Sequence, residues 1–259
     1  MRAKGLSLWL AALLCLCGVV PGAEGFSVYV LEALRSMPRA RGYASDRDAE
    51  RRLAERGIVW GEQGLRISPE GASPTFCSAA CYMVLLRALK SWESARRGGP
   101  FPPEVWRSLR VEPRHPDGYL SWGRANANGP GFAKWVADLG AGENFCDVDK
   151  ACPGDFLKFF HTEEIGSAER GHMVIYLGRS EGSKGAEPSI RYWSCNQREG
   201  YGVRSIPLGR MRHPIFTRIL RPEAFSRAAS LPAWDAWLSS MQTQPHSYRE
   251  VKARCRLRD

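Results

Sequence analysis

Cys77 and Cys81 stand four residues apart at the front of an apolar run, SPTFCSAACYMVLLRAL, residues 73–89. A thiolate that attacks a carbonyl needs a lowered pKa, which the free amides and the dipole of a helix N-terminus provide. The length of the run and its lack of alternation predict a helix with Cys77 near its first turn and Cys81 about 6 Å deeper. Because the dipole effect fades beyond the first turn, we expect Cys77 to be the nucleophile. The alternative is that both cysteines are small core residues, since free cysteine is among the most buried residue types.

A cysteine nucleophile needs a base, and His172 has the most constrained setting of the five histidines. It opens the apolar segment HMVIYL directly after Gly171, and a histidine at the mouth of a strand can reach a neighbouring helix end. The others stand in loops or in the C-terminal tail: His115, His161, His213 and His246. We therefore expect His172 to take the thiol proton, with a purely structural histidine as the alternative.

The segment SIRYWSCN, residues 189–196, is predicted to supply the group that orients the histidine. Alternation along a strand puts two sets of side chains on opposite faces, namely Tyr192, Ser194 and Asn196 on one and Trp193 and Cys195 on the other. The side-chain carbonyl of Asn196 can accept a hydrogen bond from an imidazole N–H, so Asn196 is the predicted third catalytic residue. Ser194 and, more weakly, Gln197 remain alternatives, and Asn196 could instead serve only to cap the following turn.

The helix around the cysteines must lie at the centre of the fold. Between Cys77 and Leu89 the only charged residue is Arg87, which predicts burial on nearly every side. Ser73 and Pro74 are expected to form its N-cap and first turn, with Thr75 as the alternative cap. A second helix is expected at GFAKWVADLG, ended by Gly140.

From Pro153 onward the pattern changes to closely spaced strands. The segments are GDFLKFF, GHMVIYLG, SIRYWSCN, YGVRSIPL and PIFTRIL. Strands this close, with no helices between them, predict an antiparallel sheet of about five strands. Helices followed by such a sheet predict an α+β fold.

The chain of 259 residues is long enough for one well-buried domain. We expect a signal peptide over 1–25, because Arg2 and Lys4 precede a short apolar stretch and a small-x-small exit near Gly25. The stretch is shorter than the ~20 residues that a bilayer span needs. The remainder, 26–259, is expected to be a single domain with an insertion at about 91–130 and a helical tail from about 222.

Export permits disulfides, and six cysteines remain after the expected cleavage. Cys146 and Cys152 flank a turn-like stretch and are the best candidates for a bridge. The scattered histidines and the absence of a CxxC pair argue against a zinc site. The net charge of +10 favours contact with an anionic envelope surface over nucleic acid in an exported protein, although it can also serve solubility alone.

FCSAAC at the start of a buried helix, followed in order by PGDFLKFF and GHMVIYLG, resembles the NlpC/P60-like superfamily of papain-fold cysteine peptidases and amidases. The similarity runs from about Thr75 to Val203. It implies a papain-like fold with Cys77 as nucleophile, His172 as base and a third polar residue on the next strand. It also implies hydrolysis of amide bonds in peptidoglycan or another peptide substrate, without metal or organic cofactor, and we expect a monomer.

The sequence also departs from the family pattern. An acidic residue before the nucleophile and a glycine after the serine are replaced by Phe76 and Ala79, and the third position matches no histidine. These departures leave open a catalytically inactive module that binds the wall or a partner protein. A further alternative is acyl transfer, as in transglutaminases, with Trp106 and Trp122 lining a pocket or merely forming local core.

Overall fold

The structure is a computed structural model that describes residues 25–39, 42–96, 99–112, 116–127, 130–167, 171–182 and 187–258. The expected signal peptide, apart from Gly25, lies outside these ranges, as do His115 and Asn128. Within the described ranges, no helix is both long enough and apolar enough to cross a membrane.

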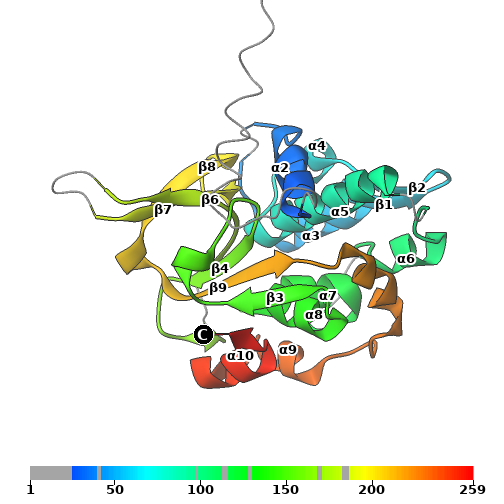
Figure 1. The fold of residues 1–259 in the computed structure, drawn as a ribbon. Coiled ribbons are helices and arrows are strands. Elements are labelled where there is room, and N and C mark those ends of the chain that lie inside the picture. The colour runs from blue at the N-terminus through cyan, green and yellow to red at the C-terminus, as the bar shows by residue number, and fades with distance from the viewer. Residues whose placement is uncertain are drawn as a thin grey trace, which may run out of the picture.

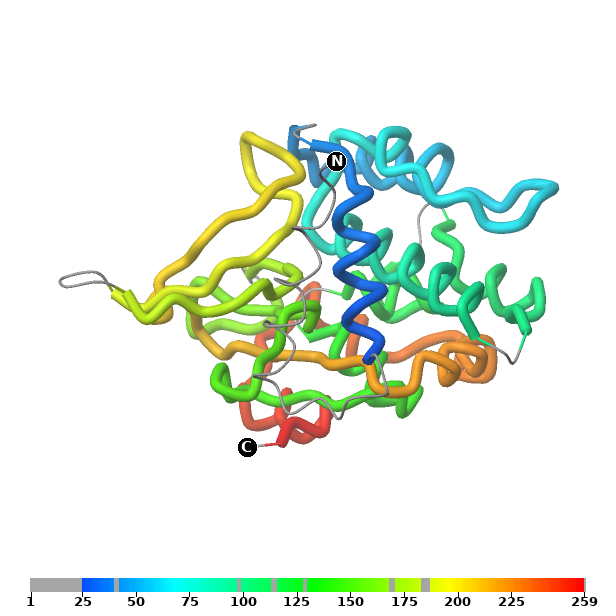
Figure 2. The backbone as a smooth tube through the Cα atoms, turned by 45° about the horizontal axis from the view of Figure 1, so that its top comes forward, coloured from blue at the N-terminus to red at the C-terminus, as the bar shows by residue number. Residues whose placement is uncertain are grey.

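A central helix packed on a mixed, mostly antiparallel sheet forms an α+β fold (Figure 1). The helix, α5, spans Cys77–Ala95 and carries both Cys77 and Cys81. It contacts strands β6 and β7, and α2 (Ser27–Arg35) packs beside it (Figure 2). The predicted placement of a cysteine-bearing helix on a sheet is therefore confirmed.

The sheet has seven strands in the order β11-β3-β9-β4-β6-β7-β8. Their bounds are β3 Gly142–Phe145, β4 Phe156–Phe160, β6 Gly171–Ser180, β7 Ser189–Asn196, β8 Gly200–Pro207, β9 Arg212–Ile219 and β11 Leu257–Arg258. All neighbours are antiparallel except β11 and β3, which are parallel.

The five predicted strands are thus confirmed as β4, β6, β7, β8 and β9, but the expected size and purely antiparallel character of the sheet were wrong. Strand β3 is too short for its alternation to be recognised in the sequence. Strand β11 has two residues within a basic tail, and it becomes a strand because the preceding helix returns the chain to β3.

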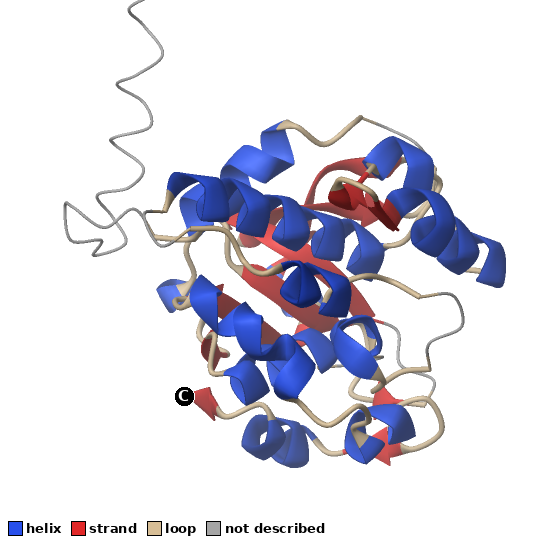
Figure 3. Ribbon diagram, turned by 90° about the vertical axis from the view of Figure 1, so that its right-hand side faces the viewer, coloured by secondary structure: helices blue, strands red, loops and turns tan. Residues whose placement is uncertain are grey.

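The remaining elements surround this sheet, with most helices lying over one side of it (Figure 3). The helices are α3 Arg47–Arg52, α4 Pro69–Ala72, α6 Pro103–Ser108, α7 Leu120–Asn126, α8 Gly131–Leu139, α9 Ala236–Ser240 and α10 Tyr248–Arg254. A π-helical turn at Leu53–Gly57 and 3-10 turns at Val148–Lys150, Leu208–Arg210 and Pro222–Ser230 join them. Two small sheets pair β1 (Ile58–Gly61) with β2 (Gly64–Ile67), and β5 (Ile165–Gly166) with β10 (Pro245–His246).

Two sequence expectations outside the sheet can be compared directly. Gly140 ends α8 in a left-handed conformation, φ 61°, as predicted for a glycine at that position. The tail from 222 was expected to be helical, and it contains a 3-10 turn, α9 and α10, but also the strands β10 and β11.

The main hydrophobic core is built around α5. The helix is buried from Ala79 to Leu86, and Ala88 and Leu89 are buried as well, in agreement with the apolar sequence. Strand alternation divides the sheet side chains: Phe156 joins the core around α5, whereas Leu157 and Phe159 join a second cluster on the other face. The sheet is therefore fixed by apolar packing on both faces.

The start of α5 differs from the prediction. Phe76 is the N-cap residue, and it makes no side-chain cap, so neither Ser73 nor Thr75 caps the helix. Tertiary contacts hold the preceding residues in an extended conformation: Tyr43 forms a parallel bridge with Thr75, and Ala44 N donates to Thr75 O at 2.9 Å. As a result, Cys77 is the first residue of the helix.

The expected disulfide between Cys146 and Cys152 is absent from this described part of the chain, where both residues are thiols. The backbone N–H of Cys152 donates to Asp155 Oδ2 at 2.8 Å. This bond and the intervening 3-10 turn fix the segment by hydrogen bonding instead.

Candidate active site

Cys77 lies where α5 presents its free amides. The first hydrogen bond of the helix runs from Ala80 N to Phe76 O at 3.0 Å, so the amides of Cys77, Ser78 and Ala79 have no acceptor within the helix. Their partial positive charge favours a thiolate and also an oxyanion formed at the same place. Cys81, by contrast, is 1% exposed, and burial raises the pKa of its thiol, as expected for a core cysteine.

The structure brings His172 to Cys77. Burial raises the pKa of the Cys77 thiol, but a hydrogen bond with His172 and the charge of that ring outweigh burial and lower the pKa to about 7. The charge of Lys158 and a backbone hydrogen bond with Met173 act in the same direction. Helix α5 and strand β6 therefore hold a thiol and an imidazole as an interacting pair.

Aromatic rings fix the orientation of His172. The rings of Phe159 and Tyr192 each pack against the imidazole in a T-shaped arrangement, with ring centroids 5.9 and 5.7 Å away and interplanar angles of 79° and 80°. Phe159 is the register partner of His172 on the neighbouring strand β4. The ring is thus held by side chains from strands on both sides of β6.

Asn196 meets the other side of the imidazole. Its Oδ1 lies 3.3 Å from His172 Nε2, while its Nδ2 donates to three backbone carbonyls, of Ser194, Gly200 and Gly202. These three acceptors fix the amide so that Oδ1 faces the histidine. Nε2 must then carry the hydrogen, which leaves Nδ1 as the nitrogen that can accept a proton. Asn196 therefore both caps its turn and sets the histidine tautomer.

The alternatives for the third residue are placed differently. Ser194 is fully buried, and its Oγ donates to Met173 O at 2.7 Å. Gln197 is exposed at the start of the turn after β7. The geometry therefore joins Cys77, His172 and Asn196 in one array.

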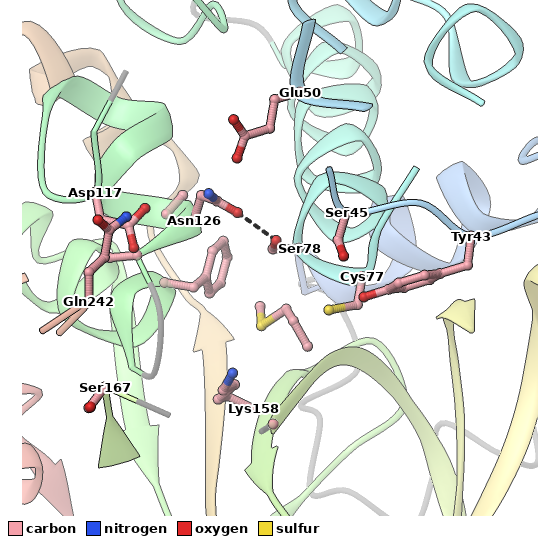
Figure 4. A pocket seen from close by; sticks show the side chains of 15 residues that line it. Tyr43, Ser45, Glu50, Cys77, Ser78, Asp117, Asn126, Lys158, Ser167 and Gln242 are labelled. Atoms are coloured by element: carbon pink, nitrogen blue, oxygen red, sulfur yellow. Dashed lines mark hydrogen bonds between the residues drawn. The ribbon is translucent and has the colours of Figure 1, made fainter. Parts of the chain in front are cut away.

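A cavity of about 590 Å³ opens in front of the thiol (Figure 4). Residues from distant parts of the chain line it, among them Tyr43, Ser78, Asp117, Asn126, Lys158 and Gln242. Ser78 Oγ donates to Asn126 Oδ1 at 2.6 Å, which ties the segment between α6 and α8 to the start of α5. Asn126 and its neighbours Ala125 and Ala127 thus form part of the wall of the cavity.

Two residues of the cavity that interact electrostatically with Cys77, Tyr43 and Lys158, were not predicted from the sequence. The Tyr43 phenol oxygen points toward the Cys77 sulfur (Figure 4), and burial, together with the charge of Cys77, raises the pKa of Tyr43 to about 12. No sequence signal marks Tyr43, because its place depends on the bridge to Thr75. Lys158 did have a signal: it is the only charged residue in GDFLKFF apart from Asp155.

Trp106 and Trp122 belong to the core. They are 7% and 4% exposed, and neither lines the cavity at Cys77. The Trp122 ring lies 5.1 Å from Tyr82 and 6.2 Å from Phe76. Both tryptophans therefore form local core, which was one of the two alternatives given by the sequence. They do not line the cavity at Cys77, where the acyl-transfer alternative would need them.

Among the described residues, no cluster of three or more histidine, cysteine or carboxylate side chains is arranged to hold a metal ion. The chain matches no protein-family model, no curated protein and no solved structure.

Proposed function

We propose that this protein is an exported cysteine hydrolase that cleaves amide bonds in cell-wall peptides, as a peptidoglycan endopeptidase or amidase of the NlpC/P60-like type. The observation that carries the proposal is the array of Cys77, His172 and Asn196, in which the pKa of the thiol is lowered to about 7 beside a cavity. Groups tuned in this way and placed in a cavity are characteristic of nucleophilic catalysis.

The mechanism follows from the positions of these groups. His172 Nδ1 takes the thiol proton, and the Cys77 thiolate forms an S–C bond with the scissile carbonyl. The amides at the start of α5 stabilise the resulting oxyanion. The C–N bond then breaks, and the imidazolium gives its proton to the leaving amine. Water, deprotonated by His172, attacks the thioester, releases the acid and restores the thiol.

The substrate class rests on export and charge together with the resemblance to the NlpC/P60-like superfamily. A net charge of +10 favours association with an anionic envelope. The cavity of about 590 Å³ has the size of a site for a peptide fragment or small ligand. We propose a secreted or periplasmic monomer that acts on peptidoglycan and binds no nucleic acid.

The test compares Cys77→Ala and Cys81→Ala with the wild type on purified sacculi, with released fragments identified by mass spectrometry. Cys81 is the matched control because it lies on the same helix but is buried away from the cavity. Cys77→Ala should reduce release by at least about a thousandfold, as loss of a nucleophile does, while Cys81→Ala retains activity. Equal release by wild type and Cys77→Ala would rule out this nucleophile.

Absence of any release by folded wild type would favour the inactive binding module. The feature that favours an inactive module is Phe76, which stands before Cys77 where the NlpC/P60-like family usually has an acidic residue. Retention of the Cys77→Ala variant on sacculi, with affinity equal to that of the wild type, would then support wall binding without catalysis.

A further inference from the structure

Asn126 is the last residue of α7, and it lines the cavity together with Cys77 and Ser78. Ser78 directly follows the proposed nucleophile, and its Oγ donates to Asn126 Oδ1 at 2.6 Å. The two neighbours of Asn126 in the chain, Ala125 and Ala127, also line the cavity, but their side chains are apolar. Asn126 is therefore the polar group that α7 contributes beside the start of α5.

The hydrogen bond with Ser78 fixes which end of the Asn126 amide is free. A separation of 2.6 Å is typical of an O–H···O bond and is shorter than an ordinary N–H···O bond. Oδ1 is therefore the atom that meets the hydroxyl, and Nδ2 is directed away from Ser78 (Figure 4). No residue in the described ranges accepts a hydrogen bond from Nδ2, so both of its hydrogens can be donated to a ligand in the cavity.

Contacts on two sides hold α7 in place and so fix the position of the Asn126 amide. The Trp122 ring lies 5.1 Å from the ring of Tyr82 on α5, measured between centroids. Arg124, which is 3% exposed, forms an ion pair with Asp235 at 3.1 Å. A donor that is already held in place loses little conformational entropy when it binds a ligand.

We propose that Asn126 is a substrate-binding residue whose Nδ2 donates to the carbonyl oxygen of the peptide unit next to the scissile amide. The inference rests on the proposed function and names a subsite of the same cavity. In Figure 4, Ser78 lies between Cys77 and Asn126, so the Asn126 amide is farther from the sulfur than the first turn of α5 is. The amides of that turn are placed for the oxyanion, and the next carbonyl of an extended substrate lies about 3.5 Å further along. The enzyme should therefore prefer peptides with a second amide at this place over simple amides.

Alkylating reagents of increasing length test this without knowledge of the substrate. Iodoacetamide carries a single carbonyl, whereas N-iodoacetylglycinamide and N-iodoacetylglycylglycinamide carry one and two further amide carbonyls. All three form an S–CH₂ bond with the Cys77 thiolate as iodide leaves. The rate of each longer reagent is divided by the rate of iodoacetamide on the same protein, which cancels the thiolate fraction. Rates are measured by mass spectrometry on the peptide that contains Cys77, and the same ratio for free cysteine gives the intrinsic reactivity.

In the wild type, the ratio for at least one longer reagent should exceed that of free cysteine. It should fall about fivefold in Asn126→Ala, as expected for the loss of one neutral hydrogen bond. Asn126→Asp retains an oxygen that can accept from Ser78 but replaces the donor by a second oxygen, so the ratio should fall at least as far, whereas a merely structural tie to Ser78 would survive. Ser45→Ala is the control, because Ser45 also lines the cavity but lies toward Tyr43 in Figure 4, and this variant should keep the wild-type ratio.

Two results would overturn the inference. One is that the ratios of both longer reagents stay at the wild-type value in folded Asn126→Ala and Asn126→Asp. The other is that the wild-type ratios are no higher than those of free cysteine, and this measurement requires no variant.

Matched wall peptides complete the experiment. One peptide has an ordinary amide next to the scissile bond, and the other has a thioamide there, whose sulfur is a poor hydrogen-bond acceptor. Wild type should cleave the first peptide with a kcat/KM about fivefold higher, and Asn126→Ala should cleave both equally. If neither peptide nor sacculi are cleaved, the proposed function fails while the alkylation ratios still test Asn126. If wild type cleaves both peptides equally, the subsite inference fails and hydrolysis stands.

Discussion

Removal of the imidazole by His172→Ala should raise the pKa of Cys77 above its ordinary value. In the wild type the pKa is about 7 instead of 9.0, because the interactions with His172 outweigh burial. A difference of this size corresponds to about 2.7 kcal/mol in favour of the thiolate. In the variant burial remains but its main opponent is gone, so we expect a pKa of 9.0 or more.

The consequence is large near neutral pH. A thiol with a pKa of about 7 is roughly half ionised at pH 7, whereas one with a pKa of 9 is only about 1% ionised. Because the thiolate is the reactive species, alkylation of Cys77 by iodoacetamide at pH 7 should slow about fiftyfold in His172→Ala.

The assay follows the alkylation rate of the Cys77 peptide from pH 5 to pH 10, so that each variant yields a titration curve. His161→Ala is the matched control, because His161 also contacts Phe159 but lies at an exposed position after β4. A midpoint for His172→Ala that stays near the wild-type value would refute the coupling between imidazole and thiol.

Three further predictions concern Asn196, the ion pair of Arg218 with Asp155, and the buried thiol of Cys255. Asn196→Ala should lower kcat about 100-fold, because Asn196 Oδ1 no longer sets the tautomer of His172. The pH midpoint of Cys77 alkylation should also rise, and a residue with only a structural role would not change this midpoint. Arg218→Ala should lower the free energy of unfolding in urea by about 3 kcal/mol, because the Asp155 carboxylate, which is 1% exposed and lies 2.7 Å from Arg218 Nη2, would be left buried without its cation. Arg212→Ala is the control: Arg212 is an exposed residue of the same β-strand, and its loss should change the free energy of unfolding by no more than about 0.5 kcal/mol. Burial raises the pKa of Cys255 from 9.0 to about 12. The neutral Cys255 thiol therefore makes its full contribution to the free energy of unfolding below pH 9, and this contribution falls by about 1.4 kcal/mol per pH unit as the pH rises toward 12. Cys255→Ala should accordingly make the loss of stability at alkaline pH less steep, as measured by urea unfolding at a series of pH values.

Short-range sequence patterns were enough to predict the main elements of the fold. The nearly uncharged run from Cys77 to Leu89 is long enough to identify a buried helix, and the apolar segments after Pro153 identified the five longer strands of the sheet. The two strands that were missed, β3 and β11, have four and two residues. Such strands carry too little periodicity to be recognised, and their pairing joins parts of the chain more than a hundred residues apart.

The three residues of the candidate array could be chosen from the sequence, but the contacts between their side chains could not be predicted from it. Cys77, His172 and Asn196 each occupy a position that local rules single out, at a helix start, at a strand start and at a strand end. The choice of Asn196 over Ser194 depended on which side chain reaches the imidazole. That was decided by three backbone carbonyls that hold the Asn196 amide and one that accepts from Ser194.

The sequence by itself determined the element types and the order of chemically competent residues, because helix and strand periodicities and the free amides of a helix start are local properties. Only the tertiary structure decided where α5 begins, since the bridge between Tyr43 and Thr75 keeps the residues before Cys77 extended. Only the tertiary structure also placed Tyr43, Asn126 and Lys158 around one cavity. Their positions depend on packing between segments far apart in the chain, which no local pattern encodes.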